Sequence, residues 1–191
     1  MNDAGATNDW EELRQLLLEI SYEERKVILT SGQESNFYVD CRETTLHGRG
    51  TMLVGRLFFE RLRGSGARAV GGPTLGADPI VTAVAMTAAL EGIEFPAFII
   101  RKATKEHGTE NRIEGLGNLH EGMEVGIAED VVTTASSTLR AIEGAEAAGL
   151  KVVKVLCLVD REEGGRENLA ERGFTLDAIY TKTTLLEGRP G

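Results

Sequence analysis

The stretch VGIAEDVVTTASSTLRAI, from Val125 to Ile142, decides the fold because a strand, a turn and a helix follow one another within it. Its first part is a continuous apolar run that ends in two acids, Glu129 and Asp130. A continuous run, rather than an alternation of apolar and polar residues, predicts a parallel strand that is covered on both faces. Hydroxyl residues then lead into a helix that we expect to begin near Ser136.

The segments on either side of this stretch repeat the order of strand and helix. Apolar spacing predicts helices at 9–20, 49–66, 78–92 and 136–149, and strands at 26–32, 36–42, 67–72, 95–101, 124–130 and 151–160. Pro79 falls in the first turn of the third helix, a position that suits proline. Strands that alternate with helices predict an α/β fold with a central, mainly parallel sheet flanked by helices.

Length and composition predict a single globular domain. A chain of 191 residues is long enough for one well-covered core and short for two. The hydrophobic fraction of 41% and the charged fraction of 27% are ordinary for a soluble protein. No apolar run approaches the length that crosses a bilayer, so we expect no membrane partner.

Charge and cysteine content narrow the class of partner. A net charge of −9 argues against a nucleic-acid binder, whose affinity comes largely from Lys and Arg on phosphates. Cys41 and Cys157 are too few and too far apart in sequence for a disulfide framework or a metal cluster. Because the N-terminus also lacks an export signal, we expect a cytoplasmic protein.

Residues just after the strands deserve the closest reading, because ligands of such sheets bind beyond the carboxyl ends of the strands. The turn GGPTLGADP, from Gly71, leads into a helix and offers backbone N–H groups that suit a phosphate. The segment from Arg101 gathers cations on an otherwise acidic chain: Arg101, Lys102, Lys105 and His107. The polar, glycine-rich stretch 102–122 is long for a connection, which indicates either a functional lid or disorder.

Glu129 and Asp130 allow three interpretations on their own. Adjacent carboxylates can accept hydrogen bonds from the vicinal hydroxyls of a ribose, bind a divalent cation, or form a solvated turn. The following TTASS sequence, 133–137, leads into a helix, so its hydroxyls and amides are suited to hold a phosphate. An acceptor of ribose hydroxyls beside a phosphate cradle predicts a site for ribose 5-phosphate.

At this point the sequence resembles a family. VGIAEDVVTTASSTLRAI is similar to the phosphoribosyl diphosphate (PRPP) signature of type I phosphoribosyltransferases. Further stretches narrow the resemblance to orotate phosphoribosyltransferases: SGQESNFYVDCRETTLH, GGPTLGADPI, RKATKEHGTENRIEG and LVDREEGGRENL. The resemblance spans roughly Leu13 to Tyr180, nearly the whole chain.

The resemblance implies an enzyme, a glycosyltransferase of the pentosyltransferase type. It would transfer ribose 5-phosphate from PRPP to N1 of orotate in de novo pyrimidine (UMP) biosynthesis, giving orotidine 5′-monophosphate and pyrophosphate. The family uses Mg²⁺ held mainly by PRPP, so no protein metal site is expected. It also implies a cytoplasmic homodimer with a catalytic loop shared across the interface, and one domain, 1–191, with a small N-terminal hood from about 20–45 and a mobile catalytic loop at about 102–116.

The same resemblance assigns roles to residues. Glu129 and Asp130 would take the ribose hydroxyls. Lys105 is expected to matter most for catalysis, together with Lys102, His107 and Arg101, which would bind the pyrophosphate group. The PRPP-binding set would also include Thr74, Leu75, Gly76, Val131, Val132, Thr133, Thr134, Ala135, Ser136 and Ser137. Orotate would be held by Arg161, whose guanidinium suits a carboxylate, by Thr133, and by backbone groups near Tyr38 and Val39.

Two departures keep alternatives open. Ala135 and Ser136 stand where the family's phosphate loop has glycines, and a backbone that needs a positive φ would cost alanine about 1 kcal/mol. Thr30 stands where some relatives carry a lysine that contacts substrate. A non-catalytic sensor of PRPP or nucleotides with the same fold therefore remains an alternative, as does a phosphoribosyltransferase for another base, such as a purine.

Overall fold

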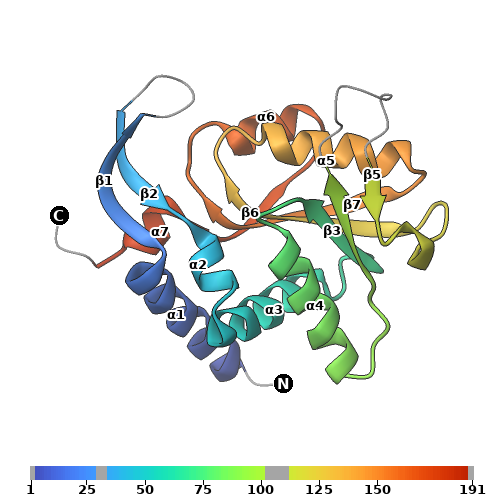
Figure 1. Cartoon of the computed structure of the whole chain (residues 1–191), viewed down its shortest axis with the longest axis horizontal. Coiled ribbons are helices and arrows are strands. Elements are labelled where there is room, and N and C mark those ends of the chain that lie inside the picture. The colour runs from blue at the N-terminus through green and yellow to red at the C-terminus, as the bar shows by residue number, and fades with distance from the viewer. Residues whose placement is uncertain (1–2, 29–33, 102–111, 189–191) are drawn as a thin grey trace.

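A mainly parallel sheet of six strands forms the centre of the computed structural model, in the order β5-β4-β3-β6-β7-β8 (Figure 1). The structure describes residues 3–28, 34–101 and 112–188. The sheet strands are β3 (Ala69–Pro73), β4 (Ala97–Arg101), β5 (Arg112–Glu114), β6 (Glu124–Val132), β7 (Lys151–Asp160) and β8 (Leu176–Thr181). Within this sheet β5 pairs antiparallel with β4, and the other neighbouring strands pair in parallel. The predicted α/β class is confirmed.

Helices cover both faces of the sheet. They are α1 (Asp3–Ile20), α2 (Cys41–Thr45), α3 (Gly48–Leu62), α4 (Asp78–Leu90), α5 (Ser136–Ala147), α6 (Gly165–Glu171) and α7 (Lys182–Leu186), with a short 3₁₀ helix, η1, at Leu116–Asn118. In Figure 1, α5 and α6 lie on one side of the sheet and α1, α3 and α4 on the other. Each face therefore has its own apolar core.

The two cores explain why the strands are continuous apolar runs. Along β7, Leu156 and Leu158 join the core beneath α1, α3 and α4, whereas Val155 and Cys157 join the core beneath α5 and α6. Successive side chains of a strand point to opposite faces, so a strand that is covered on both sides must be apolar at every position.

A separate antiparallel sheet of two strands, β1 (Tyr22–Ile28) and β2 (Glu34–Val39), precedes the main sheet. The strand predicted at 36–42 is too long at its C-terminal end. Asp40 ends it, because its carboxylate accepts a hydrogen bond from the backbone N–H of Arg42 at 3.1 Å and caps α2. The prediction for Cys41 as part of a strand was therefore wrong.

Two strands of the main sheet were not predicted. The strand β5 lies inside the stretch 102–122, which was interpreted as one long connection, and its three residues are too few to show a period. The strand β8 pairs with the second half of β7, where Val155 stands opposite Leu176. It closes the sheet beside the last part of the chain.

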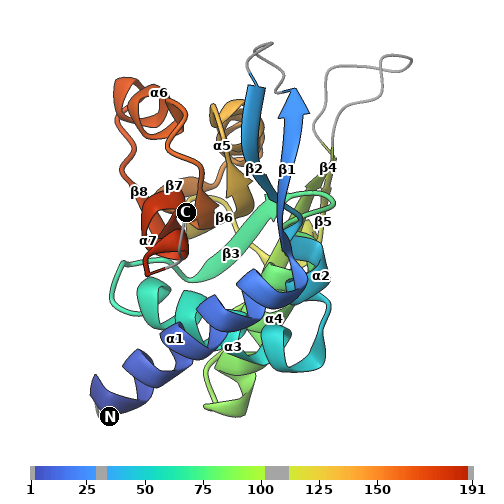
Figure 2. The ribbon, with the colours of Figure 1, turned by 90° about the vertical axis from the view of Figure 1, so that its left-hand side faces the viewer.

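The first helix packs against the last strand. Trp10 Nε1 donates to the carbonyl of Ile179 at 3.0 Å, and Tyr180 Oη donates to the carbonyl of Trp10 at 2.6 Å. Arg14 also donates to the carbonyl of Leu185 in α7 at 3.0 Å. In Figure 2, α1 and α3 lie side by side below the sheet. Helix α1 and strand β8, which are far apart in the sequence, are thus joined by reciprocal hydrogen bonds.

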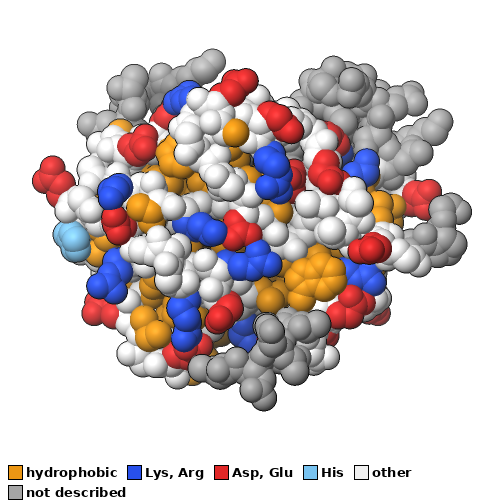
Figure 3. Space-filling view, turned by 180° about the vertical axis from the view of Figure 1, so that it is seen from behind, with side chains coloured by type: hydrophobic (Ala, Val, Ile, Leu, Met, Phe, Trp, Pro, Cys, Tyr) orange, Lys and Arg blue, Asp and Glu red, His pale blue; other side chains and the backbone are white. Residues whose placement is uncertain are grey.

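The surface carries both signs of charge. On the face shown in Figure 3, Lys and Arg side chains are interspersed with Asp and Glu side chains. Within the main sheet, ion pairs such as Lys154 with Asp177 at 2.7 Å join residues of neighbouring strands. No helix among the described ranges combines the length and the apolar character that a bilayer span requires.

Candidate active site

The carboxyl ends of β3, β4, β6 and β7 meet at one edge of the sheet, because these strands are parallel neighbours. From β3 the chain turns to β4 on one side, whereas from β6 it turns to β7 and β8 on the other. The boundary between β3 and β6 is therefore the topological switch point, where ligands of such sheets bind. The segments singled out in the sequence begin at this edge, where β3 ends at Pro73, β4 at Arg101, β6 at Val132 and β7 at Asp160; β6 is thus two residues longer than the strand predicted at 124–130.

Gly76 and Asp130 come together at the switch point. A Cβ atom added to Gly76 would lie 2.3 Å from the Asp130 carboxyl carbon, which is too close for any side chain. The turn after β3 and the acid at the end of β6 are thus in direct contact. Any larger residue at position 76 would force the Asp130 side chain to move, because its carboxyl group fills the space that a Cβ would take.

The side chains of Glu129 and Asp130 interact with each other but contact different segments of the chain. Glu129 is 4% exposed, and its Oε2 accepts from Ser137 Oγ at 2.9 Å and from Thr138 Oγ1 at 3.2 Å, both in the first turn of α5. Asp130 faces Gly76, and its Oδ1 accepts from the N–H of Val131 at 2.8 Å. The pair of acids therefore connects the first turn of α5 with the turn after β3.

Burial controls the protonation of this pair. It raises the pKa of Glu129 to about 8, the charge of Asp130 adds to the rise, and the hydroxyl groups of Ser137 and Thr138 oppose it. Burial also raises the pKa of Asp130, against the opposing effect of the Val131 N–H. Burial therefore favours the neutral form of both carboxyl groups, and the effect is larger for Glu129.

The turn at 133–135 connects β6 to α5, and its last residue, Ala135, has a left-handed backbone conformation. Ala135 has φ 60° and ψ 13°, and its side chain is 3% exposed. A residue other than glycine pays about 1 to 2 kcal/mol for this backbone. The side chains of Thr134 and Ser136 hydrogen-bond to each other at 3.0 Å, at the N-terminus of α5, where anions bind readily.

Helix α6 supports this turn. Asn168 Nδ2 donates to the carbonyl of Thr134 at 3.0 Å. A Cβ on Gly165 would lie 2.7 Å from the carbonyl oxygen of Thr133, so only glycine lets α6 approach this closely. Sequence reasoning missed both residues, because their roles depend on a contact between distant segments.

The turn after β3 is anchored at both ends. Thr74 N–H donates to the carbonyl of Ile100 in β4 at 3.0 Å, and Thr74 Oγ1 donates to Asp78 Oδ2 at 3.0 Å. Leu75 lies between these anchors, is 63% exposed and follows a cis peptide bond. A cavity of about 440 Å³ adjoins this turn, lined by Arg42, Thr45, Leu46, Thr51, Leu75, Asp78, Pro79 and Thr82.

Arg161 follows β7 and reaches the two-stranded sheet. Its Nη2 donates to the carbonyl of Phe37 at 3.2 Å, and its guanidinium forms an ion pair with Glu163 at 3.1 Å. Tyr38 and Val39, the residues predicted to contact orotate, directly follow Phe37 in β2. The structure therefore brings Arg161 and this part of β2 together.

The predicted cationic segment is described only at its first residue. Arg101 ends β4 beside Thr74 and forms an ion pair with Glu114 of β5 at 3.2 Å. Lys102, Lys105 and His107 lie outside the described residues. Their roles remain predictions from the sequence.

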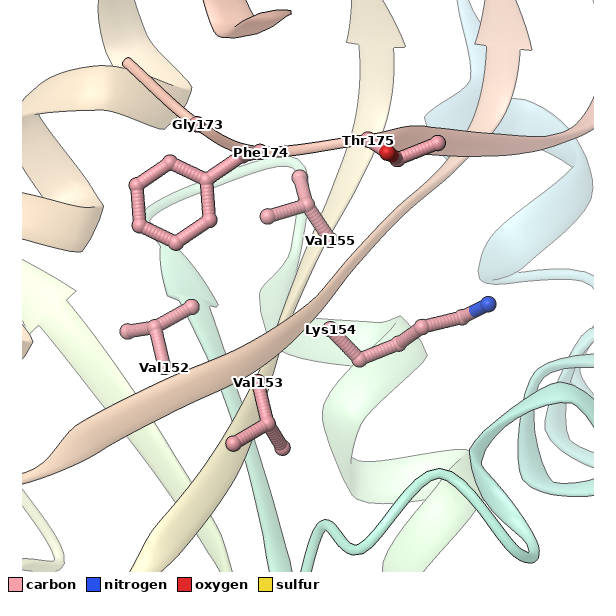
Figure 4. A pocket seen from close by; sticks show the side chains of 7 residues that line it. All are labelled: Val152, Val153, Lys154, Val155, Gly173, Phe174 and Thr175. Carbon is pink, nitrogen blue, oxygen red and sulfur yellow. The ribbon is translucent and has the colours of Figure 1, made fainter.

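A second cavity lies away from this edge. It has a volume of about 360 Å³ and is lined by the first half of β7 and the segment before β8 (Figure 4): Val152, Val153, Lys154, Val155, Gly173, Phe174 and Thr175. It is at the amino end of β7, whereas the candidate residues of the main sheet lie in or after the carboxyl ends of its strands. The candidate site is therefore at the edge that contains Asp130.

Known proteins share both the sequence and this arrangement. No family model matches the chain. An orotate phosphoribosyltransferase of Sorangium cellulosum is 43% identical over 191 residues, which cover 100% of this chain and 99% of the relative. One of Nostoc sp. is 44% identical over 180 residues, which cover 92% and 86%.

Solved structures agree. The orotate phosphoribosyltransferase of Mycobacterium tuberculosis in complex with PRPP is 35% identical, has a TM-score of 0.77 and matches 93% of this chain and 98% of its own. The orotate phosphoribosyltransferase of Aeropyrum pernix is 29% identical and has a TM-score of 0.80, and the match covers 92% of this chain and 96% of its own.

Strand order, the acid pair and the turn before α5 together define a type I phosphoribosyltransferase. The sequence relatives are similar over nearly their whole length. The chain belongs to the orotate phosphoribosyltransferase family, which confirms the resemblance drawn from its motifs.

Proposed function

We propose that this protein transfers ribose 5-phosphate from PRPP to N1 of orotate, giving orotidine 5′-monophosphate and pyrophosphate, in de novo pyrimidine biosynthesis. The observation that carries the proposal is the contact of Asp130 with Gly76 at the switch point. It sets an acceptor for ribose hydroxyls against a backbone turn suited to a diphosphate, at the edge where the phosphate turn of α5 also begins.

The PRPP molecule would span these loops. Its ribose hydroxyls would meet the carboxyl groups of Glu129 and Asp130, and its 5′-phosphate would meet the backbone N–H groups between Thr133 and Ser137. Pyrophosphate would face the turn from Thr74 to Gly76. The N-terminus of α5 favours a bound anion, since the helix dipole and its unpaired N–H groups point toward it.

Orotate would lie between Arg161 and β2, with the two-stranded sheet as the hood over the base. A guanidinium binds a carboxylate through parallel hydrogen bonds, which uracil and purines cannot make. Glu163 holds the same guanidinium at 3.1 Å, so the substrate carboxylate would compete with it. Backbone groups of Tyr38 and Val39, and Thr133, would complete the base contacts.

Charge separation explains the cationic segment. When the bond to pyrophosphate breaks, positive charge develops on the sugar ring and negative charge on the leaving group. Arg101, Lys102, Lys105 and His107 would stabilise the leaving group in the transition state more than in the ground state. Exclusion of water would protect the activated sugar, which is a role for the loop at about 102–116.

Magnesium fits this donor set as an ion bound mainly to PRPP oxygens. Within the described ranges, no group of three or more His, Cys, Asp or Glu side chains could hold a metal ion. Asp130, beside the Gly76 turn, is the carboxylate placed to meet an ion that arrives with the substrate. Bound Mg²⁺ would neutralise diphosphate charge and so ease its departure.

A cytoplasmic homodimer with a shared loop is part of the proposal. Helix α4 supports it, because most of this helix is apolar, yet two of its large side chains are exposed, Met86 at 51% and Leu90 at 81%, which together we call the α4 stripe. A predominantly apolar helix is normally buried. The first turns of α4 line the same cavity as the exposed Leu75 of the diphosphate turn, so a second copy packed on α4 would lie close to the site. The buried thiols of Cys41 and Cys157 suit a reducing cytoplasm.

The proposal is tested by the PRPP-dependent loss of orotate absorbance, with uracil and hypoxanthine as control bases. Orotate turnover alone is the expected result. PRPP binding without turnover of any base would support the sensor, and turnover of hypoxanthine would support a purine enzyme. Either outcome would overturn the assignment to orotate.

The Lys105→Ala variant tests the leaving-group mechanism. We expect kcat to fall by roughly 100-fold, because one cation would be lost from the charge that stabilises pyrophosphate. Lys154→Ala is the matched control, since this lysine lies in the first half of β7, away from the candidate site, and forms an ion pair with Asp177 of β8. Normal turnover by Lys105→Ala would contradict the mechanism.

A further inference from the structure

The candidate site contains a buried carboxyl group, that of Glu129, and the two hydroxyl groups that donate to it differ in what else they can bind. Glu129 Oε2 accepts from two neighbouring residues, Ser137 at 2.9 Å and Thr138 at 3.2 Å. Both stand in the first turn of α5, directly after the turn proposed to hold the 5′-phosphate. The acceptor of the ribose and the cradle of the phosphate are thereby linked through two side chains.

Ser137 cannot serve both groups with its hydroxyl. A serine hydroxyl has one proton to donate, and a carboxylate and a phosphate both demand a donor. Ser137 is only half-buried and belongs to the proposed phosphate set. If the Ser137 hydroxyl donated its hydrogen bond to a bound phosphate, Glu129 would keep one hydroxyl donor from α5, that of Thr138.

Thr138 has no such second duty. It is 0% exposed and lies one residue deeper in α5, on the side that faces β6. Its hydroxyl donates to Glu129 Oε2, and burial keeps it from solvent and from the phosphate turn. A buried hydroxyl that loses its acceptor, or a buried carboxyl that loses its donor, is costly, so this contact should persist.

We propose that Thr138 is a positioning residue for the transferase reaction: its hydroxyl holds the Glu129 carboxyl at the first turn of α5 while PRPP is bound. The inference rests on the proposed function, since it assumes that Glu129 receives the ribose. Sequence reasoning placed the edge of the phosphate set at Ser137 and did not include Thr138. The link makes the ribose acceptor and the phosphate cradle move as one unit.

The groups that surround Glu129 define what else could control it. Asp130 neighbours it on β6, and Cys157 stands opposite it on β7 in the sheet register. The positive charge of Arg42, on α2, lowers the pKa of Asp130. Among the described contacts of the Glu129 carboxyl, the hydroxyl groups of α5 are the ones that favour its ionised form.

The test compares Thr138→Val, which removes the hydroxyl at similar volume, with Thr138→Ser, which keeps it. For Thr138→Val we expect kcat/KM for PRPP to fall by roughly tenfold, with KM for orotate unchanged. The acid limb of the pH profile of kcat/KM should move to higher pH, because loss of a hydrogen-bond donor destabilises the ionised form of the Glu129 carboxyl. Thr138→Ser should restore both quantities.

Thr44→Val is the matched control. Thr44 is equally buried, and its Oγ1 hydrogen-bonds to Ser21 Oγ at 2.6 Å between α1 and α2. Its loss should lower stability without a change in the pH profile for PRPP. If Thr138→Val fails to fold, Thr138→Ala against Thr138→Ser makes the same comparison.

The outcomes separate this inference from the proposed function. Wild-type protein without transferase activity would refute the proposed function itself. An active wild type with an unchanged kcat/KM and pH profile in Thr138→Val would overturn only the role of Thr138. A Thr138→Ser variant as impaired as Thr138→Val would also overturn it, because the methyl group and not the hydroxyl would then matter.

Discussion

Ala135 and Glu162 are the residues other than glycine that adopt a positive φ in the described part of the chain. Both belong to loops of the candidate site: Ala135 opens α5, and Glu162 follows Arg161. Strained backbone of this kind persists where the surroundings fix it, and it gathers at functional sites. For Glu162, the fixing contacts are hydrogen bonds from Thr183 to its carboxylate at 2.9 and 2.7 Å.

Ala135→Gly should relieve strain in the phosphate turn. The left-handed backbone costs alanine about 1 to 2 kcal/mol, and loss of its buried methyl group costs about 0.8 kcal/mol. We expect a net gain in the free energy of unfolding of up to about 1 kcal/mol in urea denaturation, with a lower KM for PRPP.

Ala141→Gly is the control for this change, since Ala141 is buried in the interior of α5 with ordinary helical geometry. It should destabilise the protein by about 1 kcal/mol or more. If Ala135→Gly lowered stability as much as Ala141→Gly, the strain argument would fail.

Helix α4 shows what an element's sequence can and cannot predict. Its length and its proline in the first turn follow from the sequence, and the structure has Pro79 there. Which side of α4 is buried does not follow from the sequence, because apolar residues occur around most of this helix and give only a weak periodic signal. Similarly, β5 and η1 were not predicted, because they lie in the polar stretch 102–122, which was interpreted as one long connection.

Met86→Glu tests the proposed role of the α4 stripe. A charge on this face would have to be desolvated at the interface with a second copy, so the homodimer should dissociate at least about tenfold more readily. Analytical ultracentrifugation over a range of concentrations measures this change.

Ile20→Glu is the control for the α4 stripe, because Ile20 is also exposed but ends α1. It should leave the association unchanged. An equal effect of both variants, or none from Met86→Glu, would remove the support that α4 gives to the homodimer.

At the scale of the molecule, the class of fold could be predicted from the sequence and is confirmed, whereas the order of the strands could not; which strand ends carry chemistry stays a prediction. Strand order depends on contacts between segments far apart in the chain, such as β3 with β6. The contact of Gly76 with Asp130 and the support of the phosphate turn by Asn168 follow from that order. Local motifs could indicate each loop, whereas only the folded sheet brings the loops together.

The buried acid pair predicts how global stability depends on pH. In the folded protein Glu129 keeps its proton until its pKa of about 8, whereas its ordinary value is 4.5. Between these values the unfolded chain binds fewer protons than the folded one, so the free energy of unfolding falls as the pH rises. Glu129→Gln should remove this part of the slope and be more stable than the wild type at pH 8 by on the order of 2 kcal/mol.

Urea denaturation from pH 4 to pH 8 measures the slope. Glu146→Gln, an exposed change on α5, is the control and should run parallel to the wild type. A parallel curve for Glu129→Gln as well would show that the buried carboxyl does not couple folding to pH.

The bonds between Trp10 and the β8 segment have a consequence for biosynthesis. Helix α1 is translated well before β8, and the two bonds join residues that are 169 and 170 positions apart in the chain. The apolar side of α1, with Leu13 and Leu17, can pack on α3 soon after that helix is made. Trp10 must wait longer, because its ring N–H and its carbonyl gain these partners only when β8 has emerged from the ribosome.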